Sequence, residues 1–302
     1  MKKVIVRLGN GLGNQMFTYA AAYCFAKKNN AQLYIDDESG FYKRNRYELN
    51  NFNISAERAE KKYKFVGIIG RAKRNIFIKM NKFMKDKKFL IEKKDKEKFT
   101  HYDSNHFDIN FNNIIYFEGY YQSENYYKSE IKNILKEFSF KKKITDESFK
   151  NKERIINSNS VSIHLRENKF LKDENHSNLN KLNEEFFENN VKQIKKGVEY
   201  FDKKIKEPKY FVWSNNITKI NDLFPKDKFT IVEENSEKDP TYDLYLMSLC
   251  KNFILSTSTM HYWAAQLSNN YNKICLSPLD VKNKSGYYGF SNNKNIRASW
   301  WF

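Results

Sequence analysis

The sequence predicts an α/β protein built from two parallel-sheet domains. In both halves of the chain, short apolar runs typical of strands alternate with helical segments, and this alternation usually produces parallel sheets. The length of 302 residues corresponds to about two domains of roughly 150 residues each. A polar, charged segment at 141–160 separates the halves, so we expect domains at 1–150 and 151–302.

The first half contains three predicted strands, at 3–8, 32–35 and 114–117. A glycine-rich turn at 9–14 joins the first strand to a helix of small residues at 15–28. Apolar residues within 56–98 recur every three or four positions among lysines, which predicts an amphipathic helical stretch. After the third strand, a turn at 119–123 leads into a helix that ends near Phe138.

The second half repeats the alternation of strands and helices. Predicted strands lie at 161–164, 210–213, 229–232, 253–256 and 273–276. Predicted helices lie at 184–205, 242–250 and 260–267, with a short helix ending at 223. Because open parallel sheets bind ligands at the carboxyl ends of their strands, residues that follow these strands are the first candidates for a site.

The charge balance predicts attraction to polyanions. Lys and Arg number 54 against 36 Asp and Glu, a net charge of +18, which suits nucleic acid, anionic lipid or phosphorylated small molecules. A solvated basic surface without a partner explains the same excess. Mean hydropathy is −0.81, but 16% of the residues are aromatic, which is ample material for a core.

The cysteines and apolar runs predict a cytoplasmic protein. Three cysteines lie far apart without a CxxC pair, which excludes a disulfide framework and a cysteine zinc site. The first apolar run is broken at Arg7, too early for a signal peptide. No run reaches the ~18 apolar residues of a membrane span.

The glycine-rich turn is the first candidate binding element. Unpaired N–H groups at the start of the following helix suit a phosphate or a sugar hydroxyl, which makes candidates of Gly11, Gly13, Asn14 and Gln15. A dinucleotide-binding turn is the alternative, with Asp36 as the ribose acid. The spacing G-x-G-x-G departs from the G-x-G-x-x-G of that motif.

A second candidate is the pair His164 and Arg166, which ends the first predicted strand of the second half. Residues two apart on a strand share a face. An arginine at a sheet edge can bind a diphosphate with two parallel hydrogen bonds, and a neighbouring imidazole can add a hydrogen bond or a charge. The alternative is an Arg166 paired with Glu167.

A hydroxyl-rich turn supplies the third candidate. Ser256, Thr257, Ser258 and Thr259 precede a predicted helix, where one residue would suffice as a cap. The additional hydroxyls and the free N–H groups suit a phosphate. His261, further along, is expected to pack within the protein.

Five segments carry a resemblance to a known family. They are LGNGLGNQMFTYAAAY at 8–23, EGYYQSENYY at 118–127, VSIHLRE at 161–167, YFVWSNN at 210–216 and YDLYLMSLCKNFILSTSTMHYWAAQL at 242–267. Together they resemble the family 11 glycosyltransferases, the bacterial α-1,2-fucosyltransferases. The resemblance implies a GT-B architecture of two facing Rossmann-like domains, with the acceptor mainly on 1–150 and a GDP-sugar on 151–302.

The resemblance also implies a reaction. It is the inverting transfer of fucose from GDP-fucose, without metal or cofactor, to a glycan hydroxyl such as O2 of galactose. The acceptor would be a glycan or lipid-linked oligosaccharide of surface polysaccharide synthesis. His164 and Arg166 are the expected catalytic residues. The expected donor-binding residues are Gly11, Gly13, Asn14, Gln15, Ser214, Asn215, Thr257, Ser258 and Thr259.

Several positions depart from the family pattern. Glu167 and Asn168 stand where HIRRGDY has its second arginine and an acidic region, and Asn215 and Asn216 replace an aspartate pair. Thr257 and Asn252 replace the Asn and His of a CKHNIIANS stretch. These changes leave open a GDP-sugar other than fucose.

The catalytic base is not assigned by the sequence. An inverting displacement benefits from a carboxylate near the acceptor hydroxyl, and Asp36, Asp37 and Glu167 are candidates that spacing does not rank.

The basic stretch around 70–90 predicts peripheral contact with the anionic inner face of the cytoplasmic membrane. A packed helix with a solvated lysine face is the alternative. A nucleic-acid-binding protein is the competing function. Lysines are scattered over both halves and no common binding motif occurs, so we expect no nucleic acid partner. A Rossmann oxidoreductase is disfavoured by the glycine spacing.

Overall fold

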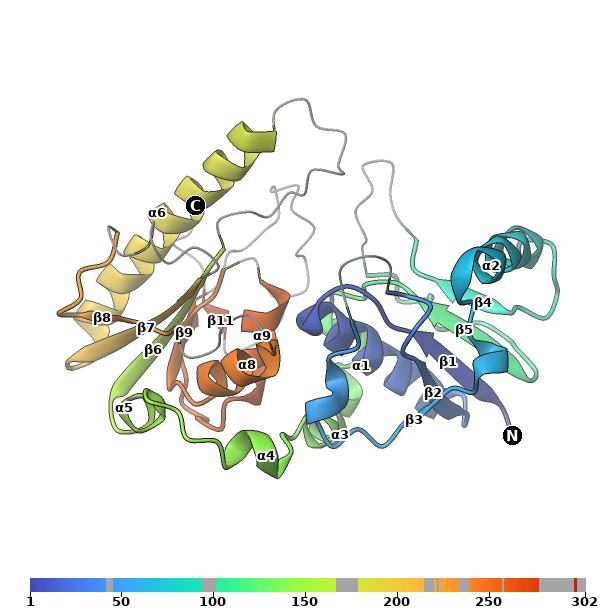
Figure 1. Ribbon diagram of the computed structural model, residues 1–302, viewed down its shortest axis with the longest axis horizontal. Helices are drawn as coiled ribbons and strands as arrows, with labels where there is room; N and C mark the ends of the chain where they lie inside the picture. Colours follow the sequence, from blue (N-terminus) through green and yellow to red (C-terminus); the bar gives the residue numbers. More distant parts are fainter. Residues whose placement is uncertain are drawn as a thin grey trace. The chain divides into compact units, whose positions relative to one another are not determined.

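A computed structural model describes residues 1–41, 46–93, 102–166, 179–214, 220, 223–233, 239–256, 258–276 and 296–297. The chain divides into two compact units (Figure 1). The first unit contains Met1–Lys143, and the second begins at Ile144. Within the described ranges, no helix combines the length and the apolar character needed to cross a membrane.

The first unit contains a five-stranded parallel sheet in the order β3-β2-β1-β5-β4. Its strands are β1 (Lys3–Arg7), β2 (Gln32–Asp36), β3 (Glu57–Arg58), β4 (Phe89–Ile91) and β5 (Ile114–Glu118). Its helices are α1 (Leu12–Lys28), α2 (Gly67–Asn81) and α3 (Ile131–Glu137), with short 3-10 turns η1 (Leu49–Asn51), η2 (Lys61–Tyr63), η3 (Glu124–Tyr126) and η4 (Lys128–Glu130). The short helix α4 (Lys142–Thr145) spans the division between the units.

Opposite faces of this sheet pack against different segments. Because side chains alternate along a strand, Phe117 and Tyr116 of β5 point to opposite faces. Phe117 contacts Phe25 of α1, with ring centroids 5.5 Å apart, whereas Tyr116 contacts Phe65, just before α2, at 4.9 Å. Helix α1 therefore covers one face, and the segment that leads into α2 covers the other.

The second unit contains a six-stranded parallel sheet in the order β11-β10-β9-β6-β7-β8. Its strands are β6 (Asn159–Leu165), β7 (Pro208–Ser214), β8 (Phe229–Ile231), β9 (Asn252–Ile254), β10 (Cys275–Leu276) and β11 (Ile296–Arg297). Its helices are α5 (Lys152–Ile156), α6 (Leu179–Lys204), α8 (Pro240–Ser248) and α9 (Thr259–Leu267). Read from β8, the sheet places its first three strands in reverse order before β9, β10 and β11, which is the Rossmann arrangement.

Strand β6 has one apolar face and one polar face. Val161, Ile163 and Leu165 are fully buried in the core that α6 completes, and Gly197 of α6 lies so close to Ile254 that an added Cβ would come within 2.8 Å of it. The alternate positions carry the polar side chains of Ser160, Ser162 and His164. This polar face of β6 contacts α9, and it supports the site described below.

The structure corrects several predicted elements. The helical stretch expected over 56–98 is confirmed only for α2, because β3 and η2 precede this helix and β4 follows it in the described part. Strand β4 has only three residues. This is too few to show the alternation of apolar and polar residues by which a strand is recognised in a sequence. The helix expected up to Phe138 begins only at Ile131 and follows two 3-10 turns. Most of the short helix expected before 223 lies outside the described residues.

Candidate functional site

The carboxyl end of β6 and the start of α9 meet in the second unit. His164 Nδ1 lies 2.9 Å from the Ser258 hydroxyl, and Ser258 caps α9 by accepting the backbone N–H of His261 at 3.3 Å. Two residues earlier on β6, the Ser162 hydroxyl lies 3.0 Å from His261 Nε2. Two serine–histidine contacts therefore fix the end of the strand against the first turn of the helix.

Both histidines of this cluster are neutral at neutral pH. Burial, together with the positive charge of Arg166, lowers the pKa of His164 to about 4. Burial lowers the pKa of His261 well below its ordinary value, and the neighbouring His164 adds to this effect. Of the two roles expected for His164, the structure supports a hydrogen bond and not a positive charge, so Arg166 is the cation of the cluster.

This cluster lies where an open sheet binds its ligand. Strand β6 is the first strand of its sheet and has β7 on one side and β9 on the other, so the chain reverses its direction of winding there. Arg166 is exposed and directly follows β6. Ser214 ends β7, where it is the neighbour of Leu165 in the register.

Three donor-binding candidates of the second half can be compared with the structure, Ser214, Ser258 and Thr259. Ser258 and Thr259 lie at the start of α9, and both are partly buried. With Ser214, His164 and Arg166, they occupy one edge of the sheet. Asn215 and Thr257 lie outside the described residues, as do Glu167, Asn168 and Asn216.

The glycine-rich turn of the first unit lies at the corresponding edge of its own sheet. Gly11 is the N-cap of α1 and is exposed, and a Cβ added there would meet nothing within 4 Å. Asn10, before it, has a left-handed backbone with φ of 62°. Gly13 is buried in the first turn, and the partly buried Asn14 accepts a hydrogen bond from Gln122 Nε2 at 2.7 Å.

Gln15 has an internal role instead of the predicted contact with a donor. Its side chain is fully buried. Its Nε2 donates to the carbonyls of Asn10 and Arg46, both at 2.8 Å, and its Oε1 accepts the N–H of Glu48 at 2.9 Å. Both amide hydrogens are used within the protein, so Gln15 holds the turn in shape.

Two of the three candidate bases are also engaged within the first unit. Asp36 is fully buried and accepts the N–H groups of Glu38 and Ser39 at 3.1 and 2.9 Å. Asp37 pairs with Lys64 at 2.6 Å and with Arg58 at 2.9 Å. These contacts stabilise the loop after β2, and the structure supports neither carboxylate as the base nor Asp36 as a ribose acid.

An ion-pair cluster at the same edge was not expected from the sequence. Glu118, which ends β5, is 4% exposed. It accepts two hydrogen bonds from Arg74 of α2, one of them from Nε at 2.9 Å, and lies 3.6 Å from Arg7, which ends β1. Burial lowers the pKa of Arg7. A charged residue that closes an apolar strand is the signal that identifies both Arg7 and Glu118.

The turn after β5 joins this cluster to the glycine-rich turn. Gly119 has φ of 156°, and a Cβ added there would come within 2.5 Å of Glu92. The Glu92 carboxylate accepts the N–H groups of Tyr120 and Tyr121 at 2.7 and 2.9 Å. The Thr18 hydroxyl of α1 donates to the Gly119 carbonyl at 2.9 Å. Two motifs about a hundred residues apart therefore form one edge.

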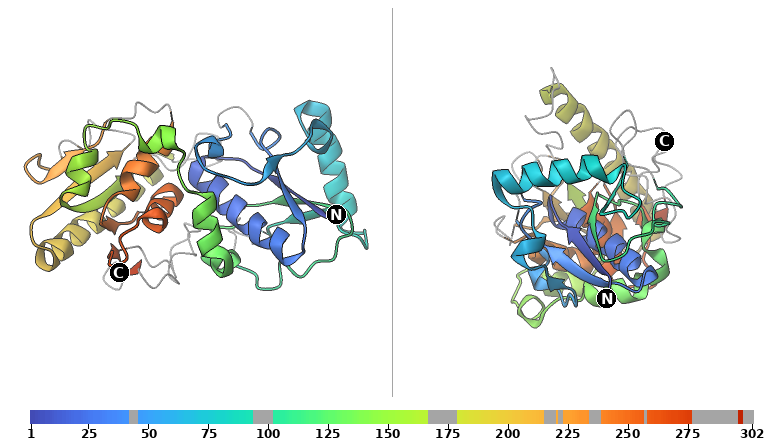
Figure 2. Two further views of the ribbon diagram at one scale, coloured as in Figure 1. Left: turned by 90° about the horizontal axis from the view of Figure 1, so that it is seen from below. Right: turned by 90° about the vertical axis from the view of Figure 1, so that its right-hand side faces the viewer.

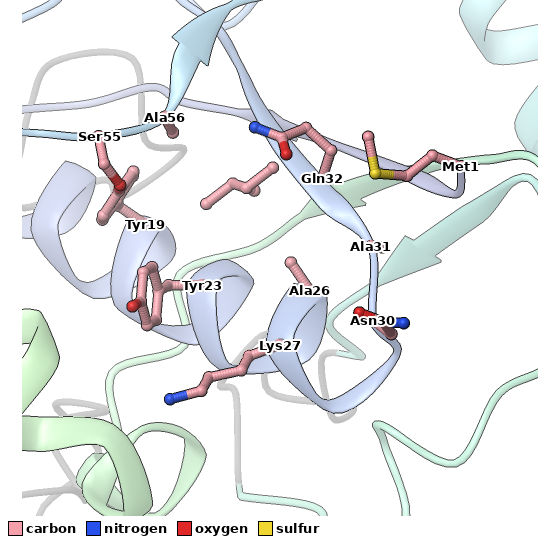
Figure 3. A pocket seen from close by; sticks show the side chains of 11 residues that line it. Met1, Tyr19, Tyr23, Ala26, Lys27, Asn30, Ala31, Gln32, Ser55 and Ala56 are labelled. Carbon is pink, nitrogen blue, oxygen red and sulfur yellow. The ribbon is translucent and has the colours of Figure 1, made fainter.

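A pocket of about 360 Å³ lies elsewhere in the first unit (Figure 3). Tyr19, Tyr23 and Lys27 of α1 line it together with Gln32, the first residue of β2. It therefore lies at the amino end of β2, away from the carboxyl edge that carries the glycine-rich turn. We do not assign the donor to it.

Comparison with known proteins places the chain among glycosyltransferases. The O-antigen biosynthesis glycosyltransferase WbnK of Escherichia coli is 28% identical over 311 residues, covering 97% of this chain and 98% of that protein. The alpha-1,2-colitosyltransferase of Escherichia coli is 27% identical, covering 92% of each. The structure is similar to that of the alpha-1,6-fucosyltransferase NodZ from Bradyrhizobium, soaked with GDP-fucose, with a TM-score of 0.52 at 14% identity over 88% of this chain and 92% of that chain.

The likeness to NodZ confirms the fold class predicted from the sequence, two Rossmann-like parallel-sheet domains of GT-B type. The model of glycosyl transferase family 11 matches residues 2–301, which confirms the resemblance carried by the five segments. The chain belongs to glycosyl transferase family 11, and the protein is a glycosyltransferase.

Proposed function

We propose that this glycosyltransferase transfers fucose from GDP-fucose to a hydroxyl of a glycan acceptor, with inversion and without a metal ion. The supporting relatives are the O-antigen glycosyltransferase and the fucosyltransferase soaked with GDP-fucose. The observation that carries the proposal is the edge of the second unit. There His164, Arg166 and the capped start of α9 meet at the point where the sheet reverses its winding.

The diphosphate of the donor would bind at this edge. Arg166 is exposed at the end of β6 and can form two parallel hydrogen bonds to phosphate oxygens. The backbone N–H groups at the start of α9 add the positive end of a helix dipole. Ser214, Ser258 and Thr259 supply hydroxyls, and Asn215 and Thr257 belong to the same proposal on sequence grounds.

These groups act most strongly as the bond between sugar and phosphate breaks. Negative charge then builds up on the leaving diphosphate, and preorganised donors stabilise that charge more than the ground state. The neutral His164 contributes a hydrogen bond whose geometry Ser258 fixes. The sugar becomes cation-like, and the acceptor hydroxyl attacks from the opposite face.

The acceptor would bind mainly at the corresponding edge of the first unit. Gly11 leaves open space beside the start of α1, and Asn10 and Asn14 offer amides there, either to the acceptor or, as predicted from the sequence, to the donor. The Arg7–Glu118 pair at the ends of β1 and β5 is a further polar surface for sugar hydroxyls. With Asp36 and Asp37 engaged elsewhere, Glu167 is the remaining base candidate of the three.

A different GDP-sugar is the second candidate donor. The departures at Asn215, Asn216 and Thr257 replace ionisable or amide groups of the family pattern, and one relative is named for the transfer of colitose. The proposed setting is surface polysaccharide synthesis in the cytoplasm, at the inner face of the membrane, on a glycan or a lipid-linked oligosaccharide.

A donor screen tests the proposal. Thermal unfolding is measured with GDP, UDP, CMP and their sugar conjugates, because a ligand stabilises the folded state according to its affinity. We expect GDP and its conjugates to raise the melting temperature and UDP and CMP to leave it unchanged. A product assay with GDP-fucose and GDP-mannose, with and without EDTA, then identifies the sugar. Preference for UDP, or loss of transfer on chelation, would contradict the proposal.

A further inference from the structure

Helix α2 presents its apolar side chains to solvent. None of its residues is buried. The exposed fractions in α2 and the turn after it are 79% for Ile68, 85% for Ile69, 56% for Ile76, 53% for Met80 and 91% for Phe83. These five side chains form what we call the outer face of α2. Scattered apolar residues are common on surfaces, but a continuous stripe marks an interaction site.

The opposite side of α2 attaches the helix to the first unit. Phe77 contacts Phe65, with ring centroids 6.3 Å apart. Asn81 donates to the Phe89 carbonyl at 2.9 Å and accepts the N–H of Lys88 at 2.7 Å. Gly70, Arg74, Phe77 and Asn81 follow one another at intervals of three or four residues, so they lie on the same face of the helix.

Specific contacts therefore fix which way the helix points. Gly70 lies against the backbone of Phe65, where an added Cβ would come within 2.6 Å. Arg74 forms its two hydrogen bonds to Glu118 of β5. Figure 1 shows α2 alongside β4 and β5, and Figure 2 shows its whole length from another side. The outer face is held away from the sheet by polar and close-packed contacts on the inner side.

The charge around the outer face has one sign. From 67 to 85 the chain contains Arg71, Lys73, Arg74, Lys79, Lys82 and Lys85 and no Asp or Glu. Lys73, Lys79, Lys82 and Lys85 are exposed. A second copy of the chain seated on this face would bring like charges together, which disfavours it as the occupant. An anionic lipid surface accepts both the apolar stripe and the lysines.

We propose that the outer face of α2 docks on an anionic membrane surface, with the five apolar side chains entering the lipid interface and the flanking lysines contacting lipid phosphates. The inference rests on the proposed function in one respect, because a lipid-linked acceptor lies at such a surface. Docking by α2 would hold the acceptor-binding unit at the membrane without a spanning helix.

The test uses the full chain and vesicles of phosphatidylglycerol and phosphatidylcholine in equal parts, with pure phosphatidylcholine vesicles for comparison. We expect co-sedimentation with the anionic vesicles. The triple variant Lys73→Glu, Lys79→Glu, Lys82→Glu should weaken this binding about tenfold or more, since each reversed charge loses an attraction to the surface. The variant Ile69→Ser, Ile76→Ser, Phe83→Ser should also weaken it, and because these residues are exposed its melting temperature should not change.

Two control variants carry a charge reversal and an apolar-to-serine change elsewhere. Lys192, Lys195 and Lys196 are exposed on α6, and their joint replacement by Glu alters the net charge equally. Tyr271, which is 94% exposed, is replaced by Ser. Neither control should weaken vesicle binding. Equal loss in the α6 control, binding to neither type of vesicle, or a concentration-dependent dimer that the apolar variant abolishes would overturn the proposal.

The two proposals fail separately. Turnover with a water-soluble acceptor should be the same in the α2 variants and the wild type, because the substituted side chains are exposed and none of them is placed at the proposed donor or acceptor edge. Vesicle binding without any response to GDP would sustain the docking face and contradict the donor site. A response to GDP without vesicle binding would support the donor site and contradict the docking face.

Discussion

At the scale of single residues, Ser258 connects β6 and α9 at the edge where we propose that the donor binds. Its hydroxyl accepts the His261 N–H and lies 2.9 Å from His164 Nδ1, so one oxygen both caps α9 and orients a ring on β6. His164 is kept neutral by burial and by Arg166. In the proposed site, His164 would therefore give a directed hydrogen bond and Arg166 the positive charge.

Replacement of Arg166 by Ala should lower transfer by about a hundredfold to a thousandfold, the usual loss when one donor to a developing charge is removed. Arg166 is exposed, so thermal unfolding should not change. The measurement is kcat and KM with the best donor, with Lys192→Ala on α6 as the control. Near-normal turnover of folded Arg166→Ala would mean that the diphosphate binds elsewhere.

Stability should depend on pH through His164. Its pKa is lowered from 6.5 to about 4 in the folded protein, so between these values the unfolded chain binds more protons. The contribution of His164 to the free energy of unfolding is therefore largest above about pH 6.5, and it decreases as the pH drops toward about 4. Urea unfolding across this range should show a shallower loss for His164→Asn than for the wild type. His261 shifts in the same direction, so some dependence persists; an unchanged slope would contradict the assignment.

At the scale of elements, the glycine-rich turn depends on one buried side chain. Gln15→Ala removes three hydrogen bonds and leaves the Asn10 and Arg46 carbonyls and the Glu48 N–H without this partner. Since each hydrogen bond contributes about 0.5–1.5 kcal/mol net, we expect a loss of about 3 kcal/mol of stability. Gln122→Ala, which removes one bond to Asn14, should cost less. If Gln15→Ala had a normal melting temperature and a raised KM for the donor, Gln15 would be a ligand-binding residue and not a structural one.

Elements bounded by strong local signals were predictable. Strands β1 and β6 are apolar runs that end beside glycine or charged residues. The hydroxyl-rich turn before α9 predicts the N-cap of this helix, which is Ser258. The cluster of His164 and Ser258 followed from the rule that strand ends share an edge. The burial of Asp36 was not predictable, because its partners are backbone groups of a loop without a periodic pattern.

Helix α2 illustrates a different limit. Its apolar and basic residues alternate with helical spacing, which correctly indicates a helix within 56–98. The pattern does not say which face turns inward. That orientation is set by Gly70, Arg74 and Asn81, whose partners Phe65, Glu118 and Phe89 lie on other elements. Tertiary contacts thus decided what the hydrophobic pattern left open.

At the scale of the whole molecule, the two units have separate sheets and cores, and the tryptophans divide unequally between them. All four Trp residues follow residue 200, and Trp213 directly precedes Ser214 at the end of β7, while Trp263 lies in α9. Intrinsic Trp fluorescence is therefore a probe of the second half of the chain.

GDP should change Trp emission in a saturable way, because Trp213 is the register neighbour of His164 and Trp263 lies in α9, whose start belongs to the proposed diphosphate site. The change should be lost in Arg166→Ala and should not occur with UDP. A glycan acceptor alone should leave the emission unaltered. If the acceptor alone produced the change and GDP did not, the assignment of the two ligands to the two units would have to be exchanged.

The internal bracing of the glycine-rich turn has a kinetic consequence. Because Gln15 already holds the turn through Asn10, Arg46 and Glu48, a sugar that binds at this edge as proposed would meet a surface that needs no ordering. Binding there then loses little conformational entropy, so encounter with this edge should not wait for a loop to rearrange.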